Sequence, residues 1–351
     1  MCVWCAYSGK RRAADVLIEC GERIEGLWSG FYTGLVTCDE EGLHCGKVAG
    51  WSKFWHEKYR VEDFHGTYGL WHSRTNSGGD YKWAHPFVGN LGIAAMVSQG
   101  NSGVFAGHDA DHIKIAEKHF QEGMRFSSAS PTLEWRKNYP SLSDGSQIHV
   151  SDLVIQLIEQ EYVRTGNPLD SIRNAMELIK EEATNVVIFR DRPGVLFFGT
   201  TSQHIVAARY KDGVALAITS LAFGKPTPRC TELPENSVGY IEPGKLVVEK
   251  LSPVFDDVDE TMPENILVSV SEFLEKNGPS TVPQICDGVI KPAMGTGFVP
   301  RSTVTYRCLQ TLMENNKIRI QPCTLVNPEG IEGRADKIEL AENPTRFRNW
   351  K

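Results

Sequence analysis

The chain has 351 residues, 41% of them hydrophobic and 23% charged, which indicates a globular protein of one large or two unequal domains and excludes collagen, coiled coil and extended disorder. The formal net charge is −7, from 37 Lys and Arg against 44 Asp and Glu, and the segment from Glu260 to Lys351 carries 11 residues of each sign. The acidic excess therefore belongs to the first 259 residues, where it argues against a general polyanion-binding surface, because phosphate contacts are made by Lys and Arg.

The N-terminal segment and the cysteines indicate a cellular compartment. No apolar stretch approaches the ~20 residues that cross a bilayer, so we predict no membrane contact. The basic residues Lys10, Arg11 and Arg12 follow the apolar ones, which is the reverse of a signal peptide. The nine cysteines are scattered and odd in number, as expected for reduced thiols. We therefore expect a cytoplasmic protein, in which one cysteine stands at position 2.

Periodic hydrophobic patterns predict the elements of a first domain. In chain order they are an amphipathic helix (11–22), two strands (31–37 and 43–48) around the turn 39–42, a buried strand (91–97) that enters the Gly-rich turn 99–103, a helix (109–121), a polar loop (127–147), a helix (151–162) capped by Ser151-Asp152, a helix (167–182) opened by Asn167-Pro168, four strands (185–190, 194–198, 204–209 and 214–220) and a last hairpin (239–248). Strands, two central helices and strands again indicate an α+β layered sandwich.

A second unit follows a linker. Residues 252–263 contain two prolines and a run of acids, which is typical of a linker. Three helices (264–276, 282–289 and 301–316) precede two strands (317–320 and 336–340) around the polar tip 327–330. Since this order is typical of a winged helix, we divide the chain into a first domain (2–251), a linker (252–263), a winged-helix-like domain (264–341) and a tail (342–351).

Cys2 becomes the N-terminal residue if Met1 is removed. Its own α-amine is then close enough to take the thiol proton, and with a reference pKa of ~7.7–8.0 a good fraction of that amine is the free base near neutral pH. One residue would then supply both nucleophile and base. The alternative is a buried cysteine that stands at position 2 by chance.

Four motifs, in order, resemble those of class II glutamine amidotransferases, the N-terminal nucleophile hydrolases that release ammonia from glutamine. They are Met1-Cys2-Val3-Trp4-Cys5-Ala6-Tyr7, His72-Ser73-Arg74-Thr75-Asn76-Ser77-Gly78-Gly79 with Ala84-His85-Pro86 after it, Met96-Val97-Ser98-Gln99-Gly100-Asn101, and Ser151-Asp152 before a helix. Order and spacing agree with the family over roughly residues 2–250. The resemblance implies a four-layer αββα N-terminal nucleophile hydrolase sandwich that requires no metal or organic cofactor.

The resemblance also implies how glutamine would be bound. Arg74 would grip the α-carboxylate with its guanidinium fork, Asp152 would hold the α-ammonium, and Ser77 would be a further substrate contact. Attack by the Cys2 thiolate on the side-chain amide makes an oxyanion, which needs fixed donors. The resemblance assigns the backbone N–H of Gly100 and a side-chain amide to that task.

The side-chain amide is the main departure from the family pattern. The family has Asn where this chain has Gln99, one methylene longer, and the neighbouring Asn101 is an alternative donor. Because losing one oxyanion donor typically costs ~10²–10³ in rate, reduced or altered glutaminase activity is a possible consequence. Smaller departures are Ser29-Gly30, where the family commonly has Arg-Gly, and Gly78, where some members have His.

Other clusters have competing interpretations. Ser77-Gly78-Gly79-Asp80 resembles the phosphate loop of ATP pyrophosphatases, but it lacks the preceding strand and the second Ser, so Asp80 is interpreted as a turn residue. His108 and His112 have the spacing of metal ligands on a helix, although an acidic helix start explains the same segment. A zinc or iron–sulfur site is a further interpretation, with Cys2, Cys5, Cys38 and Cys45 as its ligands. Such a site would use up Cys2, which could then no longer act as a nucleophile.

Two roles are open for the C-terminal unit. DNA recognition through its third helix would use the basic residues Arg301, Arg307, Lys317 and Arg319. The zero net charge and the acidic tip, with Glu329 and Glu332, argue against it and favour a protein contact or a homo-oligomer interface.

These observations give the hypothesis of a glutamine amidotransferase. Cys2 attacks the glutamine side-chain amide, glutamate is left, and ammonia passes to an acceptor on a separate synthase or transferase subunit, because nothing in the sequence resembles an acceptor domain. An alternative from a different class is a sensor or scaffold that binds glutamine or a related amino acid without turnover and signals through the C-terminal unit. A third hypothesis, suggested by Gln99 at the position where the family has Asn, is that the chain hydrolyses a different amide.

Overall fold

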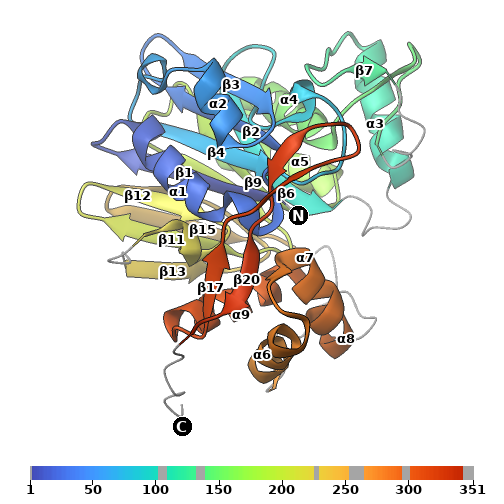
Figure 1. Ribbon diagram of the computed structural model, residues 1–351. Helices are drawn as coiled ribbons and strands as arrows, with labels where there is room; N and C mark the ends of the chain where they lie inside the picture. The colour runs from blue at the N-terminus through green and yellow to red at the C-terminus, as the bar shows by residue number, and fades with distance from the viewer. Residues whose placement is uncertain are drawn as a thin grey trace.

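The computed structural model describes residues 2–101, 109–131, 139–224, 229–252, 265–294 and 301–342. In these ranges two antiparallel sheets lie face to face, helices cover their outer faces, and a smaller C-terminal unit packs beside them (Figure 1). The layers run from α1 (Ala13–Trp28) through a seven-stranded sheet and a six-stranded sheet to α4 (Val150–Thr165) and α5 (Pro168–Leu178), which is the layered α+β sandwich that the sequence predicts. No helix in the described ranges is both long and apolar enough to cross a membrane.

The seven-stranded sheet contains two central strands that sequence patterns did not predict. Its strands are, in spatial order, β13 (Arg229–Leu233), β11 (Ile205–Tyr210), β12 (Gly213–Ala217), β1 (Val3–Gly9), β4 (Tyr68–Arg74), β2 (Tyr32–Cys38) and β3 (Leu43–Ala49). Every residue of β4 and all but the last of β1 are buried, so neither strand alternates polar and apolar residues. Helix α1 (Ala13–Trp28) covers the outer face, where Cys5 Sγ donates to the carbonyl of Leu17.

The six-stranded sheet carries α4 (Val150–Thr165) and α5 (Pro168–Leu178) on its outer face. Its strands are, in spatial order, β15 (Lys245–Lys250), β14 (Ser237–Glu242), β10 (Leu196–Thr200), β9 (Glu182–Phe189), β6 (Ala94–Asn101) and β5 (Phe87–Val88). The prediction that the second helix reaches residue 182 is wrong, because Glu182 begins β9. The N-cap of α4 is His149, not Ser151-Asp152. The remaining elements of this part are α2 (Ser52–Lys58), α3 (Asp109–Gln121), β7 (Ser130–Pro131) and β8 (Ser146–Gln147).

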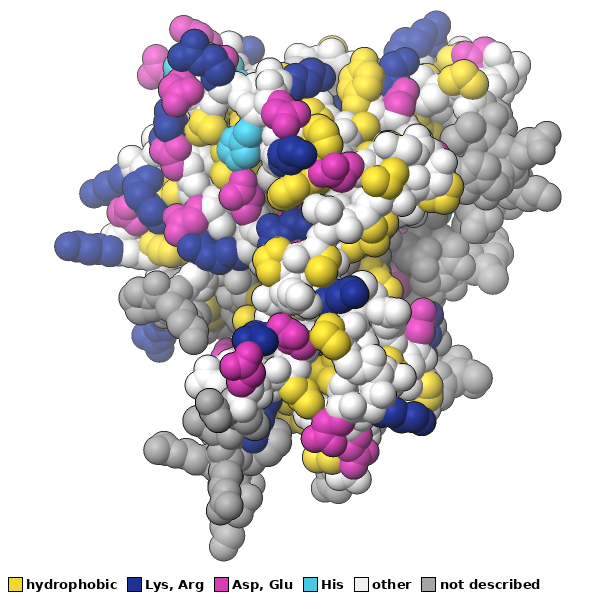
Figure 2. All heavy atoms as spheres, viewed as in Figure 1, with side chains coloured by type: hydrophobic (Ala, Val, Ile, Leu, Met, Phe, Trp, Pro, Cys, Tyr) yellow, Lys and Arg dark blue, Asp and Glu magenta, His cyan; other side chains and the backbone are white. Residues whose placement is uncertain are grey.

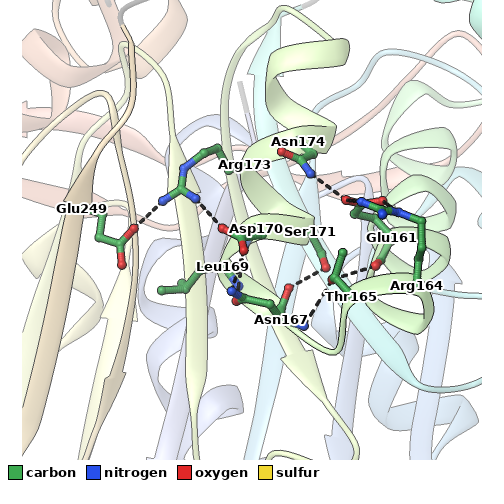
Figure 3. Close-up of polar contacts among 10 residues, drawn as sticks. All are labelled: Glu161, Arg164, Thr165, Asn167, Leu169, Asp170, Ser171, Arg173, Asn174 and Glu249. Atoms are coloured by element: carbon green, nitrogen blue, oxygen red, sulfur yellow. Dashed lines mark hydrogen bonds and ion pairs between the residues drawn. The ribbon is translucent and has the colours of Figure 1, made fainter.

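The corner between α4 and α5 forms as the sequence Asn167-Pro168 predicts (Figure 3). Oδ1 of Asn167 accepts hydrogen bonds from the backbone N–H groups of Leu169 and Asp170, which satisfies the free donors of the first helical turn. Arg173, one turn later, pairs with Asp170 and with Glu249 of β15. Helix α5 is therefore tied to the edge of the six-stranded sheet.

The C-terminal unit contains more elements than the three helices and two strands that the sequence predicts. It consists of α6 (Ile266–Asn277), β16 (Ser280–Thr281), α7 (Val282–Ile285), a π-helical turn (Cys286–Ile290), α8 (Lys291–Met294), α9 (Arg301–Glu314), β17 (Ile318–Gln321), β18 (Thr324–Val326), β19 (Glu332–Arg334) and β20 (Lys337–Leu340). A three-stranded sheet in the order β16-β20-β17 backs the helices, and β18 and β19 form a separate hairpin. Except for Ser252, the predicted linker 252–263 lies outside the described residues, as does the tail from residue 343.

The C-terminal unit is anchored at the end of α1. Arg334 makes two hydrogen bonds of 2.8 Å to the fully buried carboxylate of Asp336 and donates to the carbonyl of Glu22 at 2.6 Å. The backbone N–H of Asp336 donates to the carbonyl of Gly26. A Cβ at Gly26 would lie 2.2 Å from the Asp336 carboxyl carbon, so a glycine is required for this close approach. The unit therefore packs directly on the sandwich.

Candidate active site

Cys2 directly precedes β1, at the end of the sandwich and on its inner face. Along β1, Cys5 faces α1, whereas Ser8 reaches the opposite sheet and donates to the carbonyl of Gly194 at 2.6 Å. Because side chains alternate along a strand, Cys2 shares the inner face with Ser8. In β4 the residues His72 and Arg74 lie on the same inner face, since Trp71 packs against Gly21 of α1.

A cavity of about 220 Å³ opens at this end of the sandwich. It is lined by Cys2, Arg74, Thr75, Ser77, His85, Ser98, Gly100, Tyr139, His149, Val150, Ser151 and Glu181. Four of the predicted site residues are thus brought together from distant parts of the chain: Cys2, Arg74, Ser77 and Gly100. The cavity combines one thiol, one guanidinium and one carboxylate, so it can accommodate a small molecule that carries both charges.

Arg74 is a buried cation without a counter-ion among the described residues. It is 1% exposed, and its guanidinium lies 4.7 Å from the ring centre of Tyr32. Its donors reach Oγ of Ser77 (3.1 and 2.9 Å) and the carbonyls of Gly78 (2.6 Å) and Trp83 (3.3 Å). Burying a charge is costly unless an opposite charge pairs with it. An anionic group of a ligand in the cavity would supply that charge.

The resemblance implies that Asp152 binds substrate, but in the structure Asp152 does not line the cavity. Its carboxylate is fully buried and accepts four hydrogen bonds, from Ser127 Oγ, from the N–H and Oγ of Ser128, and from Gln156 Nε2. Asp152 therefore fastens the segment 127–128 to α4. The carboxylate that lines the cavity belongs to Glu181, which lies 3.9 Å from Nδ1 of His112.

The predicted oxyanion donors differ in their positions. Gly100 lines the cavity, whereas Gln99 does not and is 1% exposed. Nε2 of Gln99 donates to Oε1 of Gln203 at 3.2 Å, so this amide is turned into the sandwich. The backbone of Asn101 ends β6, and its side chain lies outside the described residues.

Buried histidines lie at the cavity, which His85 and His149 line. His72 and His85 stack with ring centres 4.1 Å apart, and His72 Nε2 bonds the carbonyl of Ser98. Burial lowers the pKa of His72 to about 3. The pKa of His85 is also lowered, by burial and by the positive charges of neighbours that include His149 and Arg74. Both rings are therefore neutral near pH 7.

Acid should destabilise the folded chain through two of these buried histidines. Burial lowers the pKa of His72 to about 3 and that of His204 to about 4. Below pH 6.5 the unfolded chain takes up protons that the folded chain does not, so each histidine costs about 1.4 kcal/mol per pH unit. From pH 6.5 to 5 the two together lower the free energy of unfolding by about 3 kcal/mol, because the unfolded histidines are already half protonated at pH 6.5. Urea unfolding across this range measures the loss.

A substitution at His204 checks the assignment. His204→Gln should remove about half of this acid-dependent loss. An identical pH dependence in the parent and His204→Gln would contradict the prediction.

The competing clusters have structural explanations among the described residues. Cys5 faces α1 and not the cavity, so it does not join Cys2. Asp80 accepts from the N–H of Lys82 and is the turn residue that the sequence indicates. One group with metal-ligand spacing occurs in the described ranges, and it consists of Asp39 and Glu41 in the turn between β2 and β3 and His44 in β3. His108 lies outside the described residues, so its pairing with His112 is not placed.

Several cavity residues were missed as functional residues by the sequence analysis. They are His85, Ser98, Tyr139, His149 and Glu181. His85 and Ser98 stand inside the recognised motifs and carried no assigned role. Glu181 was hidden because the second helix was extended to residue 182, whereas it lies in the turn between α5 and β9.

Comparison with known proteins bears on the fold and the class. No family model matches the chain. Among curated proteins, the glutamine–fructose-6-phosphate aminotransferase (isomerizing) of Pyrococcus horikoshii is 24% identical over 244 residues. The match covers 69% of this chain and 36% of that protein.

Two solved structures share the architecture. The glutamine phosphoribosylpyrophosphate amidotransferase of B. subtilis, complexed with ADP and GMP, matches with a TM-score of 0.55 at 13% identity, over 76% of this chain and 52% of that one. A structure described as the allosteric regulatory enzyme of purine biosynthesis has a TM-score of 0.57 at 13% identity, over 87% of this chain and 63% of that one. The chain thus spans less than two thirds of each relative. The chain shares its fold with these two structures.

Proposed function

We propose that the chain hydrolyses the side-chain amide of glutamine and delivers ammonia to an acceptor on a partner protein. The observation that carries this proposal is that one cavity brings together Cys2 and the buried Arg74, which has no counter-ion in the part of the chain that the structure describes. A thiol at the N-terminus is a nucleophile with its own base, and a guanidinium fork suits a carboxylate. Release of glutamate from glutamine by the processed protein, compared with Cys2→Ala, tests the proposal.

The proposed reaction uses this chain's own groups. The Cys2 α-amine takes the thiol proton, and the thiolate attacks the amide carbon. The tetrahedral oxyanion accepts a hydrogen bond from the backbone N–H of Gly100. The protonated amine then gives its proton to the leaving nitrogen, which departs as ammonia, and water hydrolyses the thioester to glutamate and regenerates the thiol. Because the chain's own groups supply nucleophile, base and acid, no metal or organic cofactor is required for this route.

Glu181 is proposed to hold the α-ammonium of glutamine in place of Asp152. Glu181→Gln should raise KM for glutamine roughly 10- to 100-fold with little change in kcat, because a hydrogen bond to a charged group is worth about 1.5–3 kcal/mol. Glutaramic acid, which is glutamine without the α-amino group, is the matched control substrate. Its KM should be the same for the parent and for Glu181→Gln. An equal rise of KM for both substrates would show that Glu181 acts on the cavity in another way.

The C-terminal unit is proposed to contact protein and not nucleic acid. Its helix α9, the one that would read DNA, is largely buried, and Arg307 pairs with Glu232 at 2.9 Å. The hairpin of β18 and β19 also lies on the sandwich, where Glu332 accepts from Trp51 Nε1. On the face shown in Figure 2, acidic and basic side chains are interspersed. A partner that carries the ammonia acceptor, or a second copy of the chain, fits such a mixed surface better than a polyanion does.

Binding without turnover is a second candidate function. The orientation of Gln99 favours it, because the side-chain donor expected for the oxyanion does not line the cavity. In that case glutamine would bind the parent and Cys2→Ala equally, and neither would release glutamate.

A further inference from the structure

Gln99 is held by residues outside the cavity. Its Nε2 donates to Oε1 of Gln203 at 3.2 Å, and the same oxygen accepts from Oγ of Ser302 at 3.0 Å. Nε2 of Gln203 in turn donates to Oε1 of Glu182. Gln99, Gln203 and Ser302 are each 1% exposed, so water does not compete for these hydrogen bonds.

The carboxylate of Glu182 sets the direction of the network. Gln203 directs its NH₂ group toward a carboxylate oxygen of Glu182, so its carbonyl oxygen faces Gln99 and Ser302. Gln99 must therefore present an N–H to Gln203. That donor is drawn into the sandwich, although the residues on either side of Gln99, Ser98 and Gly100, both line the cavity.

The network reaches the C-terminal unit. Ser302 lies in the first turn of α9, and the next residue, Thr303, pairs through Oγ1 with Nδ1 of His204 at 3.1 Å. Two adjacent side chains of α9 thus hold the loop between β10 and β11, and one of them contacts the residue that holds Gln99. The position of α9 and the orientation of Gln99 are connected by two hydrogen bonds.

We propose that Gln203 is a positioning residue that holds the Gln99 amide away from the cavity, and that α9 keeps Gln203 in place through Ser302. This inference rests on the proposed glutaminase function. It gives the C-terminal unit a role in setting the rate: while α9 is docked, the side-chain oxyanion donor is withdrawn. When Gln203 no longer accepts from Gln99, this amide is released to donate to the oxyanion.

The substitution Gln203→Met tests the proposal, because it removes the acceptor and keeps the length of the side chain. We expect kcat for glutamate release to rise about tenfold, part of the ~10²–10³ that one oxyanion donor is worth. KM should stay the same, because the contacts proposed for the carboxylate and the ammonium of glutamine are untouched. Ser302→Ala, which only loosens Gln203, should raise kcat about threefold.

Two controls separate this role from a structural one. Gln99→Ala in the Gln203→Met background should cancel the gain, because the gain depends on the Gln99 amide. Thr303→Val cuts the neighbouring contact between α9 and the loop without touching Gln203, and kcat should equal that of the parent. A structural role alone would lower kcat in Gln203→Met.

The outcomes distinguish this inference from the function on which it rests. If the parent releases glutamate in a Cys2-dependent way, and folded Gln203→Met has an equal or lower kcat, the inference is wrong and the proposed function stands. If Gln203→Met does not fold, Ser302→Ala decides by the same criterion. If no chain, variants included, exceeds Cys2→Ala, the proposed function fails and the inference with it.

Discussion

Replacement of Cys2 by alanine should lower kcat for glutamate release by at least ~10⁴-fold, because loss of a nucleophile removes the reaction path and not only a contact. Cys2 is the one thiol among the described residues that line the cavity, so no neighbouring cysteine takes its place. Glutamine binding to Cys2→Ala, measured by calorimetry, should persist because Arg74 and Glu181 are unchanged. Equal turnover by Cys2→Ala and the parent would contradict the proposed function.

The free α-amine of Cys2 is the second half of this prediction. A chain with a removable N-terminal tag provides a matched pair: with the tag in place the amine is an amide and has no basic lone pair, and after cleavage Cys2 is the first residue. The tagged chain should be inactive and the cleaved chain active. Activity of the cleaved chain should rise with pH through the ~7.7–8.0 range of an α-amine. Equal rates for both would show that another group is the base.

The sequence predicted the layers of the fold better than its centre. Helix α1, the hairpin of β2 and β3, and the corner at Asn167 follow from local periodicity and capping, which a sequence displays directly. Strands β1 and β4 were missed because burial on both faces removes the alternation that identifies a strand. Strand β4 carries Arg74 and strand β1 directly follows Cys2. Hydrophobic periodicity therefore fails to predict the two strands on which the candidate site is built.

The candidate site was predictable only as far as motifs extend. Cys2, Arg74, Ser77 and Gly100 were named from their motifs, and they line one cavity. The network from Gln99 through Gln203 to Ser302 was not predictable, because it joins residues 104 and 99 positions apart along the chain. Tertiary hydrogen bonds of this range leave no local pattern. A one-methylene difference at Gln99 was visible in the sequence, but where that amide points depends on partners from two other elements.

Arg74→Met should raise KM for glutamine ~10²–10³-fold, because truncating one partner of a buried charge pair costs about 2–5 kcal/mol. Arg74 is 1% exposed and has no carboxylate partner among the described residues, so the ligand carboxylate would be its counter-ion. The Met side chain keeps an apolar stem beside the ring of Tyr32, whose centre lies 4.7 Å from the guanidinium. Steady-state kinetics with glutamine measures the change in KM.

The same substitution also removes the hydrogen bonds from Arg74 to Ser77 and to the carbonyls of Gly78 and Trp83, so a loop effect must be separated from the loss of charge. The substrate 4-aminobutanamide, which is glutamine without its α-carboxylate, makes this distinction. The parent and Arg74→Met should have the same low affinity for 4-aminobutanamide, because neither complex contains the pair of guanidinium and carboxylate. A fall in affinity for 4-aminobutanamide as large as that for glutamine would mean that Arg74 only supports the loop. A fall for glutamine alone would identify Arg74 as the carboxylate-binding residue.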